Sequence, residues 1–224
     1  MKAKFGVNSV MPINKKLKNG YTMYDWVKRQ KCFPAFCMRT LCGENKITAE
    51  EMEFLHARDC KVGLVIRDLT EAAVSSANGT EHAAKAVEAA KELGVPQNEG
   101  VAIFAEIKSE WSVNHNWMLS FAQMVSANGY TPGFIGNTDS SKNFNFDRQS
   151  SHFVQVTGDV NYFGSVFMAT EPKLDTMPEE WTPYCPSALT PEDMHLWCCG
   201  TTTFDTVQVE DVYARDDNVL GVMW

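Results

Sequence analysis

The chain has no apolar run of the length that a membrane span requires, and it does not begin with a secretory signal. Its first residues, MKAKFGVNSV, are basic but lack the continuous apolar segment at the centre of such a signal. We therefore expect a protein without a membrane span that is cytoplasmic at synthesis. Any function outside the cell then requires release by lysis or a non-classical route.

Positive charge is also in short supply. The 224 residues include 20 Lys and Arg against 28 Asp and Glu, which gives a net charge of -8 and a pI near 5.1. Nucleic acids and anionic membrane surfaces repel an acidic protein face. The overall charge therefore argues against either as the main partner.

Closely spaced cysteine pairs with histidines nearby, which are typical of zinc sites, are missing. The seven cysteines have irregular spacing, and five histidines are dispersed among them. An odd number of cysteines in a chain of this length indicates reduced, buried thiols. No glycine-rich phosphate-binding motif follows the first apolar run, where GVNSV stands. We therefore expect neither a metal nor a cofactor.

The stretch that best indicates chemistry runs from Gly94 to Trp111, GVPQNEGVAIFAEIKSEW. A helix ending in Gly-Val-Pro is followed by an apolar run that ends at Glu106, which is the pattern of a buried strand with a carboxylate at its end. In parallel sheets covered by helices, functional groups gather where strands end. Glu106 is therefore the first candidate for a catalytic group.

Strands and helices alternate at least five times along the chain, without a repeat period, which indicates sequential βα units and a parallel sheet. Expected helices begin after Thr22 and Thr48, from Thr80, and at Asn116. The expected strands are residues 4–10, 32–38, 61–66, 101–106, 131–137, 153–156, 165–170, 195–199 and 206–213. This pattern predicts an α/β fold, a single (β/α)8 barrel of the TIM type with shortened helices in its second half. A doubly wound open sheet is the alternative.

Several segments in this order resemble the glycoside-hydrolase-like domain related to the family 25 lysozymes. They are FPAFCMRTL, KITAEEMEFLHARDCKVGLVI, GTEHAAKAVEAAKELGVP and VAIFAEI, followed more loosely by GYTPGFIGN, LWCCG and VQVEDVY. Arg39, Lys46, Thr48, Glu51 and residues 94–96 match the family pattern. The resemblance implies one barrel domain over residues 1–224. For active relatives it also implies hydrolysis of a cell-wall polysaccharide such as peptidoglycan.

The chain departs from that pattern at acidic positions. Asn8 stands where the family's first strand carries an Asp, after a Gly-aromatic or Gly-Val start. The second acid near Glu106 is replaced by Lys108 or Phe104, depending on the direction of counting. Cys198 replaces the Gln of a Trp-Gln pair. The chain therefore has fewer acidic residues at these positions than the resemblance implies.

A glycosidase needs two carboxylates, one to protonate the leaving oxygen and one to act as nucleophile or base. Glu106 is our candidate general acid/base, and its partner is Asp68, Glu210 or Asp211, each at an expected strand end. Alternatively, an N-acetyl group of the substrate acts as nucleophile and Asn8 orients it. The structural alternative for Glu106 is a salt bridge with an arginine, Arg39 or Arg67.

The candidates for substrate binding are Asn8, Arg39, Lys108, Trp111 and Trp197. Tryptophan rings offer flat apolar faces to sugars, whereas Trp117, within a helix, is expected in the core. For Arg39 an internal ion pair is the stronger interpretation. Cys198 and Cys199 are weak candidates for a nucleophile, because a strand directs His195 to the opposite face from Cys198.

Two functions follow from these residues. The first is a glycoside hydrolase that acts on peptidoglycan or a related polysaccharide through Glu106. The second is a catalytically degenerate barrel that binds a carbohydrate or protein partner. Several carboxylates converging on one cleft favour the first, and a lone Glu106 neutralised by Arg39 or Lys108 favours the second.

Overall fold

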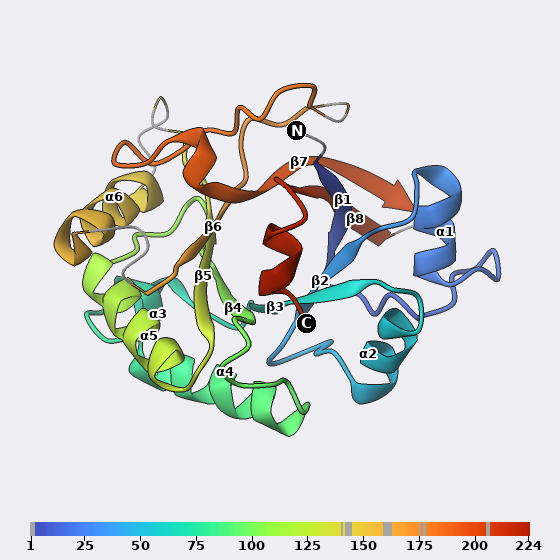
Figure 1. Cartoon of the computed structure of the whole chain (residues 1–224), viewed down its shortest axis with the longest axis horizontal. Helices are drawn as coiled ribbons and strands as arrows, with labels where there is room; N and C mark the ends of the chain where they lie inside the picture. Colours follow the sequence, from blue (N-terminus) through green and yellow to red (C-terminus); the bar gives the residue numbers. More distant parts are fainter. Residues whose placement is uncertain are drawn as a thin grey trace.

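The fold is a closed barrel of eight strands in the order β1 to β8 (Figure 1). It is seen in a computed structural model that describes residues 3–139, 141, 145–158, 163–174, 176, 178–204 and 207–224. The strands are β1 (Lys4–Ser9), β2 (Phe36–Thr40), β3 (Lys61–Ile66), β4 (Ala102–Glu106), β5 (Thr131–Gly136), β6 (Val166–Ala169), β7 (Met194–Phe204) and β8 (Val207–Ala214).

The α-helices lie around the outside of this barrel (Figure 1). They are α1 (Met23–Gln30), α2 (Ala49–His56), α3 (Glu71–Ser75), α4 (Thr80–Glu92), α5 (His115–Ala127) and α6 (Asn145–Thr157), with short 3-10 turns η2 (Pro191–Asp193) and η3 (Val219–Val222). None of the helices in the described part of the chain has the length and apolarity to cross a membrane.

The expected barrel is confirmed, and so are several helix starts. Thr22 and Thr48 accept hydrogen bonds from the backbone N–H groups of Asp25 and Glu51, which fixes where α1 and α2 begin. Strand β2 begins at Phe36, four residues later than expected, because Pro34 cannot contribute a backbone donor to a sheet.

Two parts of the prediction are wrong. Residues 153–156 are not a strand but the end of α6, whose buried residues Phe146, Ser150, Phe153 and Val154 recur at helical spacing. The last strand also departs from a parallel sheet, because β8 runs antiparallel to both β7 and β1. A chain that returns directly from β7 needs no helix there. Thr206, the expected start of the last strand, lies outside the described residues.

Two layers of buried side chains hold the barrel together. One fills the space between the strands and the outer helices, and the other fills the interior with Phe36, Met38, Val65, Phe104 and Met168 among its largest members. The interior rings lie over glycines of neighbouring strands. A Cβ atom at Gly6 would come within 2.5 Å of the Phe36 ring, and one at Gly133 within 2.4 Å of the Phe104 ring. The close backbone approach expected for the glycines of TPGFIGN is therefore confirmed.

Replacing Gly133 by alanine should destabilise the protein by about 1–3 kcal/mol, because the new methyl group overlaps a ring in a filled interior. Urea denaturation measures the loss. Gly221→Ala is the control, since nothing lies within 4 Å of its added Cβ. The variant Gly133→Ala/Phe104→Leu should recover part of the loss, and equal stability of both glycine variants would contradict the packing argument.

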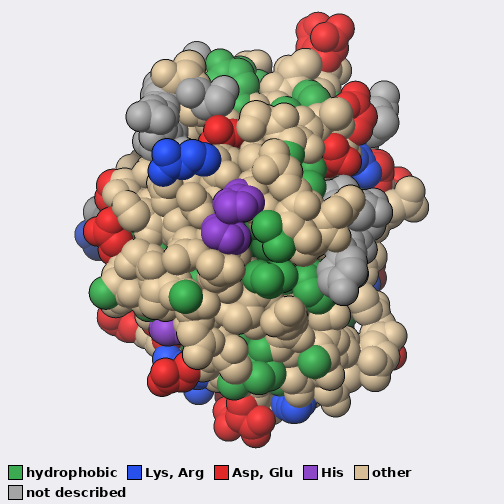
Figure 2. Space-filling model, turned by 90° about the vertical axis from the view of Figure 1, so that its left-hand side faces the viewer, with side chains coloured by type: hydrophobic (Ala, Val, Ile, Leu, Met, Phe, Trp, Pro, Cys, Tyr) green, Lys and Arg blue, Asp and Glu red, His purple; other side chains and the backbone are tan. Residues whose placement is uncertain are grey.

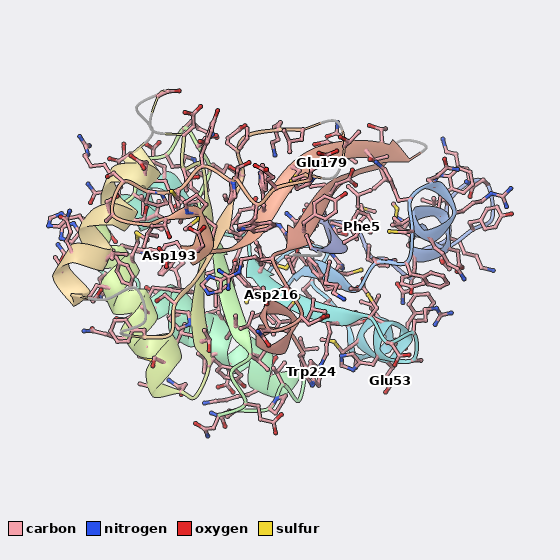
Figure 3. The ribbon with its side chains drawn as sticks, turned by 45° about the horizontal axis from the view of Figure 1, so that its top comes forward. Phe5, Glu53, Glu179, Asp193, Asp216 and Trp224 are labelled. Carbon is pink, nitrogen blue, oxygen red and sulfur yellow. The ribbon has the colours of Figure 1, made fainter. Side chains whose placement is uncertain are left out.

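The C-terminal segment closes one mouth of the barrel. Val219 and Met223 pack onto the interior cluster, and the backbone of Trp224 exchanges two hydrogen bonds with Val62 at 2.6 and 3.0 Å. The Trp224 ring also contacts the His56 ring of α2 edge-on, with centroids 5.0 Å apart (Figure 3). The open mouth of the barrel is therefore the opposite one, where the seven parallel strands end.

Candidate functional site

Polar side chains form the last layer of the barrel interior at its open mouth. On β4 the inward positions are Ala102 and Phe104, so the alternation of a strand also turns Glu106 inward, at the rim. Arg67 follows β3 in the same phase as Val65. Because β8 runs antiparallel, its early residue Glu210 lies beside Asn8 of β1 in the sheet register.

These four side chains form a continuous hydrogen-bonded network. Arg67 donates through Nε to Glu106 Oε2 at 2.8 Å and through Nη1 to the Thr40 hydroxyl at 2.8 Å. Its Nη2 donates to Asn8 Oδ1, and Asn8 Nδ2 donates in turn to Glu210 Oε2 at 2.6 Å. Two carboxylates from strands far apart in the sequence are thus linked through one guanidinium and one amide.

The two charged partners of the ion pair in this network differ in their exposure to solvent. The Arg67 side chain is 12% exposed and that of Glu106 is 30% exposed. Burial lowers the pKa of the Arg67 guanidinium, and the neighbouring Glu106 opposes that lowering. Since a guanidinium keeps its proton in proteins, Arg67 places a fixed positive charge beside Glu106.

Two hollows meet at the network. One has a volume of about 250 Å³ and extends toward the loops after β4, β5 and β6, where Lys108, Glu110 and Glu171 line it. The other has a volume of about 230 Å³ and extends toward Val10 and Gln208. Asn8, Glu106 and Glu210 border both hollows. We call the two together the cleft.

Lys173, in the loop after β6, lines the larger hollow and donates to the thiol of Cys198 at 3.2 Å. Burial raises the pKa of the Cys198 thiol well above its usual range. Burial also acts to lower the pKa of Lys173, but Cys198 and Glu210 outweigh it and the pKa is raised. Cys198 therefore stays a neutral thiol, which does not suit a nucleophile.

The remaining acidic candidates lie outside the cleft. Asp68 pairs with Lys85 of α4. Asp211 follows the inward-facing Glu210 and so points out of the barrel, where it pairs with Lys31 at 3.0 Å and accepts from the Thr202 hydroxyl. Of the two possible terminal acids, only Glu210 lines the cleft.

Arg39 lies outside the cleft, completely buried between β2 and α2, and forms the internal ion pair that was its stronger interpretation. Its partner is Glu51 of α2, with Nε to Oε1 at 2.6 Å. Trp197 is also buried, and its indole N–H donates to the carbonyl of Pro172. Trp117 is a core residue, as expected.

Three of the five substrate-binding candidates lie at or beside the cleft, and the first is Asn8, which borders both hollows. Lys108 lines the larger hollow, and its ammonium lies 5.0 Å from the centre of the Trp111 ring. Trp111 is half-buried and packs against the core.

The structure adds residues that the sequence analysis did not select: Asn137, Thr170, Glu171 and Lys173 line the larger hollow. Asn137 and Thr170 directly follow β5 and β6, so the rule that singled out Glu106 would have found them. Lys173 lies in a proline-containing loop, and no local pattern indicates that it returns to the barrel.

The arrangement contains features of both expected functions. Four carboxylates line the larger hollow, Glu106, Glu110, Glu171 and Glu210, so Glu106 does not stand alone. It is nevertheless in the salt bridge with Arg67 that was its structural alternative, and not paired with Arg39 or Lys108. Within the described ranges, no three His, Cys, Asp or Glu side chains are grouped to hold a metal ion.

Known structures share this fold. An uncharacterized protein of B. stearothermophilus is 22% identical with a TM-score of 0.80, and the match covers 99% of this chain and 100% of that chain. The Tat-secreted protein Rv2525c of Mycobacterium tuberculosis is 13% identical in complexes with HEPES (TM-score 0.60, covering 94% of each chain) and with L-tartrate (TM-score 0.63, covering 97% of this chain and 98% of that chain). A comparison with curated proteins gives no match.

The sequence itself matches the Rv2525c-like, glycoside hydrolase-like domain over residues 36–214. That range includes seven of the eight strands, together with Arg67, Glu106 and Glu210. It agrees with the carbohydrate-related function that the sequence analysis expects. The chain belongs to the Rv2525c-like, glycoside hydrolase-like domain family.

Proposed function

We propose that the protein is a glycoside hydrolase that acts on peptidoglycan or a related cell-wall polysaccharide, with Glu106 and Glu210 as its two carboxylates. One observation carries this proposal. Of the four acidic candidates, these two alone border both hollows of the cleft, whereas Asp68 and Asp211 are held by lysines elsewhere.

The ion pair with Arg67 divides the roles. Arg67 holds Glu106 in an ion pair at 2.8 Å, and we assign this fixed carboxylate the role of nucleophile or base. Glu210 has no arginine partner among the described residues, and Asn8 donates to its Oε2 and not to its Oε1. Glu210 is then the acid that protonates the leaving oxygen, and Glu106 is the base or nucleophile.

The shape of the cleft supports a polymeric substrate. The carboxylates lie where two hollows of similar volume meet, so one sugar on each side of the scissile bond has a place. Structures of the related Rv2525c hold HEPES or L-tartrate, small polar molecules that are compatible with a polar cleft.

A second candidate is a barrel that binds such a polysaccharide without cleaving it. The observation in its favour is the network itself, because Arg67, Asn8 and Glu210 satisfy one another's hydrogen bonds without a substrate. Asn8, where the family resemblance implies an Asp, adds to this alternative.

The two candidates are separated by assaying purified cell walls and chitin-type oligomers. We expect the protein to reduce wall turbidity and release reducing ends, and the double variant Glu106→Gln/Glu210→Gln to do neither while it still sediments with walls. Asp68→Asn/Asp211→Asn removes the same charge outside the cleft and should remain active. A folded wild-type protein that binds walls but releases no reducing ends would establish the binding function instead.

A further inference from the structure

The segment from Val10 to Phe33 is basic, whereas the chain as a whole is acidic. It contains six Lys and Arg residues and a single acidic residue, Asp25, in a protein of net charge -8. That one carboxylate is engaged at the start of α1, where it accepts from the Thr22 hydroxyl at 2.6 Å. The acidic character that argues against anionic partners therefore does not extend to this segment.

The cations of the segment are exposed. Lys15, Lys16, Lys18, Lys28 and Arg29 all project into solvent. None of these five lies within ion-pair distance of a carboxylate in the part of the chain that the structure describes. We call these five residues the basic surface.

The basic surface is fixed in place. A bridge between Lys16 and Thr22 closes the loop before α1, and the Tyr21 ring packs on the Trp26 ring of that helix at 5.5 Å. Arg29 donates to the Tyr21 hydroxyl at 3.0 Å. These contacts hold loop and helix together, so the charges have a defined arrangement.

Two exposed aromatic rings lie among these charges. The Tyr21 residue is 40% exposed and Phe33 is 65% exposed, and the ammonium of Lys28 lies 4.1 Å from the centre of the Phe33 ring. Flat rings beside cations offer apolar faces for sugars and charges for acidic substituents.

The loop that carries three of the basic residues begins beside the cleft. It follows β1 directly, and Val10, which is 50% exposed, lines the smaller hollow. Helix α1 and this loop form the right-hand edge of the molecule in Figure 1. On the opposite side, shown in Figure 2, acidic side chains are scattered among uncharged ones, and the described residues form no comparable cluster of Lys and Arg.

We propose that the basic surface binds an acidic polysaccharide, a glycan strand with carboxylates on its sugars. Positive charges, exposed rings and a loop that begins beside the cleft fit such a strand. An anionic membrane fits less well, because the apolar residues of α1, Met23, Tyr24 and Val27, are buried and leave no apolar face to insert. The proposal does not rest on hydrolysis.

The test measures binding of the whole protein to polygalacturonate by calorimetry in about 50 mM NaCl, where screening of exposed charges is weak. The variant Lys16→Glu/Lys18→Glu/Lys28→Glu should raise the dissociation constant by about tenfold or more, and added salt should weaken wild-type binding. The control Lys46→Glu/Lys61→Glu/Lys91→Glu makes the same charge change at exposed lysines elsewhere and should bind like the wild type. Neutral dextran and vesicles of phosphatidylglycerol and phosphatidylcholine are the comparison ligands.

Three results overturn the proposal: no binding of polygalacturonate by the folded wild-type protein, equal binding by both triple variants, or binding of dextran to the same extent. Binding to the vesicles and not to the glycan would assign the surface to a membrane instead. Activity on uncharged chitin-type oligomers is measured separately, so a failed hydrolase proposal leaves this result unaffected.

Discussion

Replacing Glu51 by leucine should lower the free energy of unfolding by about 3–5 kcal/mol, because it leaves the buried charge of Arg39 without its partner. Arg39 is completely buried and uses all five of its N–H donors. Two go to Glu51, two to the carbonyls of Ser9 and Val10, and one to the carbonyl of Asn45. Glu51 also accepts from the backbone of Ile13 at 2.7 Å. One ion pair thus ties β2, α2 and the loop after β1 together on the outer side of the barrel.

Urea denaturation of Arg39→Met, Glu51→Leu and the double variant measures this effect. Each single change should be severe, and the double variant should be less destabilised than the sum of the two, because neither charge is then left alone. Glu50→Gln, on the exposed side of the same helix turn, should change stability by less than about 0.5 kcal/mol. Additive losses in the double variant would show that the two charges stabilise the fold independently.

This pair illustrates what local patterns can and cannot predict. The spacing of Thr48 and Glu51 predicts the start of α2, and Thr48 does cap the Glu51 N–H at 3.2 Å. The same pattern predicts that the Glu51 side chain caps the helix in return, but that carboxylate binds Arg39, twelve residues earlier. A buried guanidinium needs a carboxylate more than an exposed helix end does, and only the packed structure shows that they meet.

The candidate site also has one residue that a local sequence pattern predicts and one that only the packed structure identifies. Glu106 could be selected from sequence, because a buried apolar run directs the residue after it to the rim of a parallel barrel. Glu210 and Asp211 could not be separated, since adjacent strand residues point to opposite faces and the register of β8 decides which faces inward. The antiparallel direction of β8 was within reach of the sequence, because the six residues between the expected strands 195–199 and 206–213 are too few for a parallel crossover.

The net charge of the whole chain gives no indication of the basic surface. A net charge of -8 predicts an acidic exterior, but charge acts over distances of about 10 Å at moderate salt. A cluster of cations in one loop and helix therefore keeps its own field. The helix α6 was misassigned for a related reason, because the four residues FVQV at its end also read as an apolar strand when the spacing back to Phe146 is ignored.

Replacing Glu106 by glutamine should reduce hydrolysis by about 10³-fold or more on every substrate that the protein cleaves, because the base or nucleophile is needed whatever the leaving group. Glu210→Gln should differ in one respect. Its loss should be as large on polysaccharide, whose leaving oxygen needs a proton, but about tenfold or less on an aryl glycoside with a good leaving group. The measurement is kcat/KM for both variants on both substrates.

The difference between the two variants tests the role of Arg67. If Glu106 is the charged group because Arg67 lies 2.8 Å away, the aryl glycoside rescues Glu210→Gln alone. Rescue of Glu106→Gln instead would reverse the roles and mean that substrate binding breaks the ion pair. Asp211→Asn, on the residue next to Glu210 but outside the barrel, controls for a general effect on β8 and should leave both rates unchanged. For the proposed hydrolase, the two kcat/KM ratios therefore test whether the carboxylate paired with Arg67 is the base or nucleophile and Glu210 is the acid.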